Sequence, residues 1–222
     1  MKGLDPGEAM NVQQELQRLA FYGIASADSF AMRQVARAAL AGLADLKVTQ
    51  HPLGFYHLLL YKQGALSMRL HYWPPRDRPP NVAVTPFHDH IWALQSCILV
   101  GEIENVLVSL SPNEIGPYNL ALIEQIDGVD CVVPSSKRVE ISKEESTIYK
   151  SGESYSMAPR LIHCTRIQEG LAAVTMVRSE VIEMGGPWTL IPAGYSGQSP
   201  ARILLDNRRS SELKSEICEL LR

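Results

Sequence analysis

The first part of the chain has apolar positions at helical spacing. Within residues 8–48, four of them fall on one face of a predicted helix: Leu16, Leu19, Ala20 and Ile24. Residues 30–46 are rich in Ala, Arg, Leu and Met, which favour helix. Asp28 lies between the two stretches and can cap the second. The pattern predicts two helices, ended by the break at Pro52.

After Gly54 the pattern changes to short segments rich in β-branched and aromatic residues. They are 55–62, 66–73, 97–110, 137–141, 146–150, 163–168 and 171–182. Pro and Gly separate them, and no long helical pattern intervenes, so a βαβ arrangement is excluded. Many short strands with turn signals predict a mainly β sandwich or barrel. Residues 210–222 carry an apolar stripe at helical spacing and predict a short C-terminal helix.

Length and composition refine this picture. A chain of 222 residues predicts one domain, divided here into a helical segment 1–53 packed on the barrel, a barrel 54–196, and a tail with its helix 197–222. The formal net charge of −3 argues against a dedicated nucleic-acid-binding protein. No run of about 18 apolar residues predicts a membrane helix, and no secretory signal is visible. The four cysteines are widely spaced, which favours a reducing cytoplasm.

The stretch around His88, Asp89 and His90 carries the candidate chemistry. On a strand, His88 and His90 point to the same side and Asp89 to the other. Two imidazoles on one side can bind one cation, and His163, at the start of a predicted strand, can supply a third ligand. An HxH pair without any metal is the alternative. If the histidines face the barrel interior, they need partners, and a metal satisfies several imidazoles at once.

These residues resemble two motifs of the cupin family, a small β-barrel. His88, His90 and Gly101 match parts of the first motif, and Gly152, Pro159 and His163 match parts of the second. The resemblance covers roughly residues 54–195 and implies a cupin-type double-stranded β-helix, or jelly-roll barrel.

Within cupins, the chain is most similar to cysteine dioxygenase and related thiol dioxygenases. An apolar strand ending at Trp73 runs into a Pro-rich loop and then into His88-Asp89-His90. The resemblance implies a three-histidine, mononuclear non-haem Fe(II) site. The glutamate of the first motif is missing, because Leu94 or Gln95 occupies its neighbourhood; three-histidine cupins also lack it. The Ser-His-Tyr triad of the thiol dioxygenases is missing too, which argues against cysteine as the substrate.

Several residues are candidates for holding a substrate. An Arg inside the barrel is a buried charge that needs a carboxylate or phosphate, which a substrate can supply. Arg178 is the candidate catalytic residue and Arg69 is a weaker candidate for the pocket wall; the alternative is that each points to solvent. Tyr155 is a candidate hydroxyl group beside the metal. The other weaker candidates for the pocket wall are Tyr72, Trp92 and Gln95. His57 and His71 are expected to be core or cavity residues, and His51 a loop residue.

Three functions follow from these expectations. The first is a cytoplasmic Fe(II) oxygenase that oxidises a small polar or anionic metabolite with O2. The second is a cupin that uses Zn, Ni or Mn for lyase or isomerase chemistry, since zinc also accepts three histidines. The third is a non-catalytic ligand-binding cupin. No nucleic-acid or membrane partner is expected, and a homodimer is implied by the resemblance alone.

Overall fold

The computed structural model describes residues 6–25, 27–43, 45–81, 83–126, 129–195 and 202–222. Two helices precede the strands, α1 (Pro6–Tyr22) and α2 (Ser29–Gly42), and α3 (Asn207–Leu220) follows them. The Asp28 carboxylate accepts hydrogen bonds from the amides of Phe30 and Ala31, so it caps α2 as predicted. No helix in the described ranges is long and apolar enough to cross a membrane.

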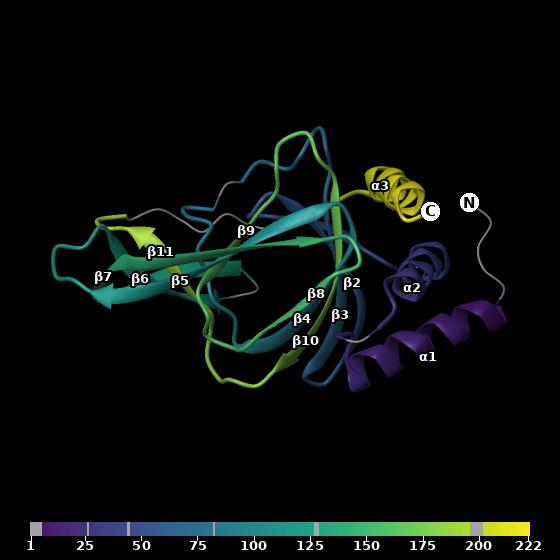
Figure 1. Cartoon of the computed structure of the whole chain (residues 1–222), viewed down its shortest axis with the longest axis horizontal. Helices are drawn as coiled ribbons and strands as arrows, with labels where there is room; N and C mark the ends of the chain where they lie inside the picture. The colour runs from purple at the N-terminus through teal and green to yellow at the C-terminus, as the bar shows by residue number, and fades with distance from the viewer. Residues whose placement is uncertain (1–5, 26, 44, 82, 127–128, 196–201) are drawn as a thin grey trace.

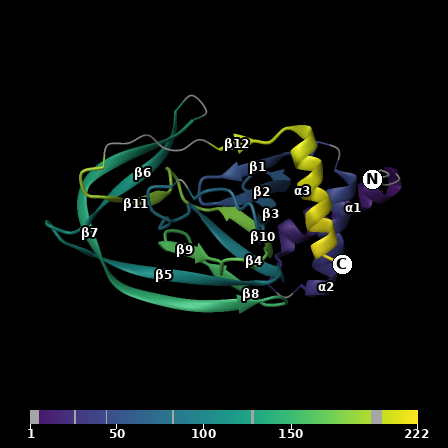
Figure 2. The same ribbon diagram turned by 90° about the horizontal axis from the view of Figure 1, so that it is seen from above.

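The strands form two antiparallel sheets. The first has the order β12-β1-β2-β3-β10-β4-β8, and its strands are β1 (Val48–His51), β2 (Phe55–Gln63), β3 (Leu66–Trp73), β4 (Trp92–Val100), β8 (Ser154–Met157), β10 (Ala173–Val181) and β12 (Ile203–Leu204). The second has the order β11-β6-β7-β5-β9, with β5 (Glu102–Pro112), β6 (Tyr118–Ile126), β7 (Val129–Lys150), β9 (His163–Arg166) and β11 (Trp188–Pro192). The predicted mainly β, jelly-roll architecture, with helices before the first strand and after the last strand of the chain, is confirmed (Figures 1 and 2).

Some strand boundaries differ from the prediction. The predicted strand 97–110 is two strands, because the chain turns at Gly101, whose φ is +74°. A Cβ at Gly101 would lie 2.1 Å from the carbonyl oxygen of Ala172, so only glycine fits this turn. Strand β1 lies inside the segment expected to be helical, and it places His51 in a strand instead of a loop.

The three helices pack against the outer face of the first sheet. One apolar cluster joins helix and strand residues that are almost completely buried, among them Leu16, Leu40, Leu213, Leu58, Leu70 and Met176. Burying a leucine side chain contributes about 2 kcal/mol, so this cluster is a main source of stability. Figure 1 shows the helices on one side of β2, β3, β4 and β10, while the second sheet extends away on the other side. The inner face of the first sheet is therefore free to line a cavity.

Candidate metal centre

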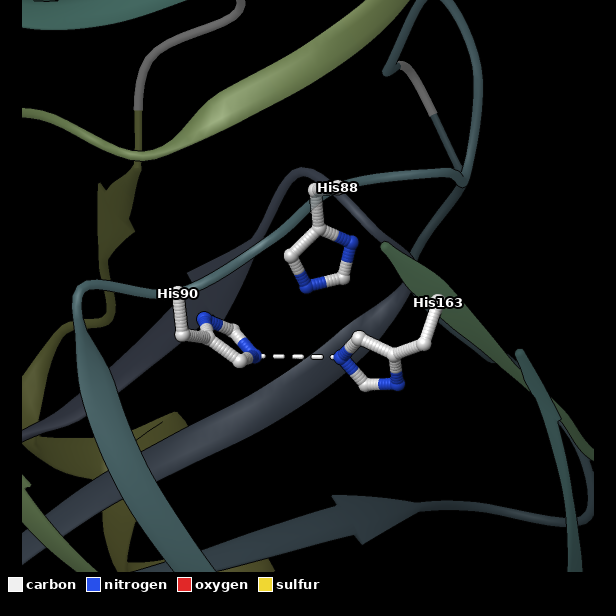
Figure 3. A group of neighbouring side chains, drawn as sticks. All are labelled: His88, His90 and His163. Atoms are coloured by element: carbon white, nitrogen blue, oxygen red, sulfur yellow. Dashed lines mark hydrogen bonds between the residues drawn. The ribbon is translucent and has the colours of Figure 1, made fainter. Parts of the chain in front are cut away.

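Three histidines converge between the two sheets. One ring nitrogen from each of His88, His90 and His163 lies within 4.8 Å of the other two. The Nε2 atoms of His90 and His163 are 3.1 Å apart, and the three rings point toward one another (Figure 3). The sequence predicted these three residues as the ligands of one ion, and the structure brings them together.

Backbone pairing holds the ligand segments in place. His88 is not inside a strand; it forms an isolated antiparallel bridge to His163 at the start of β9. The His88 amide donates to the His163 carbonyl at 3.0 Å, and the His163 amide donates back to the His88 carbonyl at 2.9 Å. The two imidazoles therefore come from directly paired positions. His90 follows two residues later, just before β4 begins.

Acceptors behind the rings fix how the histidines face the centre. The Nδ1 atom of His163 lies 2.8 Å from Oδ1 of Asn105, and Nδ1 of His88 lies 2.9 Å from the carbonyl oxygen of Pro86. Because the Pro86 carbonyl can only accept, and Asn105 presents its oxygen, we assign the ring protons to these Nδ1 atoms. Each Nε2 then directs a lone pair into the centre, as a metal ligand must.

The electrostatics keep the histidines neutral. Burial lowers the pKa of His88, although the Pro86 carbonyl opposes this shift. Burial also holds the pKa values of His90 and His163 well below the usual range, and neighbouring imidazoles add to the effect. Neutral imidazole is the form that binds metal ions, so the site is ready for a cation at neutral pH.

One pair of ligand nitrogens has the spacing that binding to a single ion requires. Two nitrogens about 2.1 Å from one ion, at a right angle, lie about 3 Å apart. The separation of 3.1 Å between the His90 and His163 nitrogens matches this value. Three nitrogen ligands from one side leave further coordination positions facing the cavity. The donor set suits Fe(II) and Zn(II), and no carboxylate belongs to this group.

A cavity of about 300 Å³ opens in front of the three histidines. All six histidines of the chain line it: His51, His57, His71, His88, His90 and His163. The lining also contains Lys62, Arg69 and Arg202, and no Asp or Glu is among the described lining residues. The cavity is therefore basic and is large enough for a small organic molecule.

Three of the predicted pocket residues lie in this cavity. Trp92 stacks on His90, with ring centroids 4.7 Å apart. The Arg69 guanidinium also contacts Trp92 and lies 5.2 Å from the centroid of its ring. Tyr155 also lines the cavity and stacks on Tyr149. Burial raises the pKa of Tyr155 to about 12, so its hydroxyl keeps its proton at neutral pH.

The other three predicted residues face the helices instead. Tyr72 donates a hydrogen bond to Glu216 on α3, and Gln95 accepts one of 2.8 Å from the Ile24 amide. Arg178 donates to the Ala20 carbonyl at 2.7 Å. The structure thus corrects their expected position in the pocket. The physical reason is that successive side chains of a strand point to opposite faces of the sheet. Each of these residues lies an odd number of positions from a cavity residue on its own strand, which is Arg69 on β3, Trp92 on β4 and Thr175 on β10.

Sequence reasoning did not single out Asn105 or Thr175. Asn105 is only 4% exposed and accepts from a predicted ligand, but a lone Asn in an apolar strand is a weak signal. Thr175 lies on β10 with its hydroxyl inside the cavity wall. His71 had one usable signal: it shares the alternation of Arg69 and Trp73 on β3, so one inward-facing residue implies the others. His57 faces the same side because it pairs with His71 across β2 and β3, which the sequence does not reveal.

Comparison with known proteins finds remote likenesses among the solved structures. No protein-family model and no curated protein matches the chain. The solved structure of DMSP lyase DddQ from Ruegeria pomeroyi DSS-3 is 14% identical, with a TM-score of 0.48, over 86% of this chain and 100% of that one. A variant of the L-ribose isomerase from Acinetobacter sp. DL28, in complex with L-ribose, is 13% identical, with a TM-score of 0.36, over 81% and 82% of the two chains.

Likenesses this remote do not decide the chemistry of this chain. The chain itself shows a jelly-roll sandwich with three histidines that converge on its inner side, a group that can hold one metal ion.

Proposed function

We propose that this chain is a mononuclear Fe(II) enzyme that oxidises a small polar or anionic molecule with O2. One observation supports this proposal above the others: three neutral imidazoles, with no carboxylate among them, converge at the wall of a basic cavity. Such a ligand set leaves the full double positive charge of the ion, which favours a substrate that carries negative charge. Iron(II) bound there would supply the one-electron and O2 chemistry.

The residues of the chain would orient the reactants. Asn105 and the Pro86 carbonyl hold the His163 and His88 rings with their Nε2 atoms toward the cavity. Trp92 covers one face of His90 and limits the access of water from that side. The Tyr155 hydroxyl, protonated at neutral pH, is proposed as a hydrogen-bond donor to the bound substrate.

Zinc chemistry is the second candidate. The same three nitrogens form a set that zinc binds, with a fourth position for water or substrate. A lyase or isomerase would need no O2. A cytoplasmic location and a homodimer stay predictions from the sequence.

Nitric oxide, a diatomic stand-in for O2, tests the first candidate. Iron(II)-loaded protein is expected to give the high-spin ferrous-nitrosyl EPR spectrum, and His163→Ala is expected to give none. A wild type that holds iron but shows no such spectrum contradicts an O2-reactive site. Product formed from small acids under argon, with zinc loaded and iron removed, would favour the second candidate.

A further inference from the structure

The turn that leads into His163 contains a strained residue. Pro159 and Arg160 form this turn between β8, which ends at Met157 in the first sheet, and β9, which begins at His163 in the second. Arg160 has a φ of +66°, in the left-handed region that residues other than glycine rarely adopt. Such a conformation costs free energy and persists where the surrounding structure fixes it. The contacts of Arg160 must therefore offset its strain.

Hydrogen bonds fix both the backbone and the side chain of Arg160. Its amide donates to the His90 carbonyl at 2.9 Å. Its Nη1 donates to the Gly186 carbonyl, and its Nη2 donates to the Met184 carbonyl, each at 2.9 Å. Nη1 also lies 3.5 Å from Oδ2 of Asp89, the buried residue next to His90. One residue thus contacts the segment of His90 and the loop before β11.

These contacts join the two segments that supply neighbouring ring nitrogens. The Nε2 atoms of His90 and His163 lie 3.1 Å apart, and the two rings come from different parts of the chain (Figure 3). The backbone bridge between His88 and His163 holds one part of this arrangement. The Arg160 amide, three residues before His163, makes a further bond between the segments, and it bonds to His90 itself. The position of one imidazole relative to the other therefore depends on the Arg160 turn.

We propose that Arg160 is a positioning residue of the metal centre, whose strained turn and guanidinium contacts set the separation of the His90 and His163 nitrogens. Glycine would adopt the same turn without steric cost, but it would lose every side-chain contact to Asp89 and to the loop before β11. The planar guanidinium presents several donors in a rigid fork, whereas lysine presents a compact ammonium group on a flexible stem. This inference rests on the three-histidine centre of the proposed function and is independent of its O2 chemistry.

A role in folding alone would give a different result from a role in positioning. If Arg160 only stabilised the fold, its removal would lower the free energy of unfolding of the metal-free protein. The metal that the folded variant bound would then keep its affinity and its coordination geometry. If Arg160 positions the ligands, affinity and geometry both change in the folded protein, because the two nitrogens no longer meet at the required spacing.

Titration of the metal-free chain with cobalt(II) distinguishes the two roles, because the visible spectrum of bound cobalt(II) reports the geometry of its ligands. Competition with a chelator gives the affinity, and circular dichroism shows that each variant is folded. Arg160→Gly is expected to bind cobalt(II) at least about tenfold more weakly than the wild type, the effect typical of a lost partner behind a ligand. Its visible bands are expected to shift in position and intensity.

Asp77→Gly is the matched control. Within the described ranges, Asp77 is the other non-glycine residue with a positive φ, at +50°, and it is exposed. It is not among the described residues that line the cavity. The substitution relieves the same kind of backbone strain at a turn away from the three histidines. Asp77→Gly should therefore keep the cobalt(II) affinity and the spectrum of the wild type.

Arg160→Lys keeps the test decisive if Arg160→Gly does not fold. Lysine retains the side-chain bulk at the turn and a positive charge near Asp89, but it loses the rigid fork that reaches two carbonyl groups. This variant is expected to bind cobalt(II) about threefold more weakly than the wild type, with a smaller shift of the visible bands than Arg160→Gly gives.

Wild-type affinity and spectrum in the folded Arg160 variants would overturn the inference, even if these variants unfold more easily. An equal loss in Asp77→Gly would also overturn it, because the effect would then not depend on the contacts of Arg160. A wild type that binds no cobalt(II) would contradict the metal centre and this role together. Failure of the oxygenase alone looks different: iron-loaded protein would give no nitrosyl spectrum, while cobalt(II) binding would still depend on Arg160.

Discussion

Asn105 is the residue on which the orientation of His163 depends. Its Oδ1 accepts the His163 Nδ1 proton at 2.8 Å, and its Nδ2 contacts the Met157 sulfur at 3.6 Å. Removing such a partner behind a ligand typically costs 10–100-fold in metal affinity. We predict that Asn105→Ala weakens Zn(II) binding by about tenfold or more, measured by competition with a chelator.

The conservative variant distinguishes positioning from general damage. Asn105→Asp keeps an acceptor at the same place and is expected to retain zinc affinity close to that of the wild type. Equal loss in both variants, or no loss in Asn105→Ala, would show that the hydrogen bond does not orient the ligand.

At the residue scale, the sequence was sufficient to predict the three histidines that converge, but not to predict which residues line the cavity. The spacing of His88 and His90 is local, so strand alternation alone puts both rings on one side. The sequence favoured Arg178 over Arg69 as the inward-facing arginine, and the structure shows the reverse, because each is one cation in an apolar strand and its face cannot be read locally. Which face turns inward depends on the packing of the helices, and a shift of one residue reverses it. Asn105 and Thr175 matter only through contacts that the folded chain creates.

At the element scale, a polar clamp joins the three segments around the metal centre. Asp89 lies between two ligands and is 2% exposed; its Oδ1 accepts the Trp188 amide at 2.6 Å, and its Oδ2 lies 3.5 Å from Nη1 of Arg160. Arg160 also donates to the Gly186 and Met184 carbonyls at 2.9 Å. The clamp thus ties the His88–His90 segment to the loops before β9 and before β11.

We predict that Asp89→Ala lowers the free energy of unfolding by about 2–4 kcal/mol. The Trp188 amide and the partly exposed Arg160 would lose their acceptor, and such buried groups are costly to leave unpaired. Asp89→Asn keeps an oxygen for the amide and should lose about half as much. Urea unfolding of the metal-free proteins measures both. Loss below about 1 kcal/mol in Asp89→Ala would mean that the clamp is not needed for the fold.

The sequence predicted most helices and strands as the correct type of element, but it did not predict all of their first and last residues. Alternating and helical apolar patterns indicated α1, α2, α3 and most strands. The turn at Gly101 was missed because its need for glycine comes from Ala172, distant in sequence and close in space. Strand β1 is four residues long and is stabilised by pairing with β2 and β12, which a local pattern does not reveal.

At the scale of the whole molecule, six histidines facing one cavity couple stability to pH. Burial lowers the pKa of His57 to about 3, and holds those of His51 and His71 well below the usual value of 6.5. Below pH 6.5 the unfolded chain binds protons that the folded chain does not. The contribution of these groups is therefore complete above pH 6.5 and is lost as the pH falls toward 3.

We predict that the metal-free protein loses about 2 kcal/mol of unfolding free energy between pH 7 and pH 5 from His57 alone. His57→Gln cannot titrate in this range, so its stability should depend less steeply on pH by that amount. Urea unfolding at the two pH values measures the difference. Parallel pH profiles for wild type and variant would contradict a buried, neutral His57.

The most direct measurement is the metal content of protein purified from iron-supplemented cells, wild type beside His163→Ala. The three-histidine centre predicts about one equivalent of metal per chain in the wild type and almost none in the variant, with both proteins folded by circular dichroism. A wild type without metal, or a variant that keeps its full complement, would contradict the centre and return the three histidines to ordinary polar residues of the sandwich.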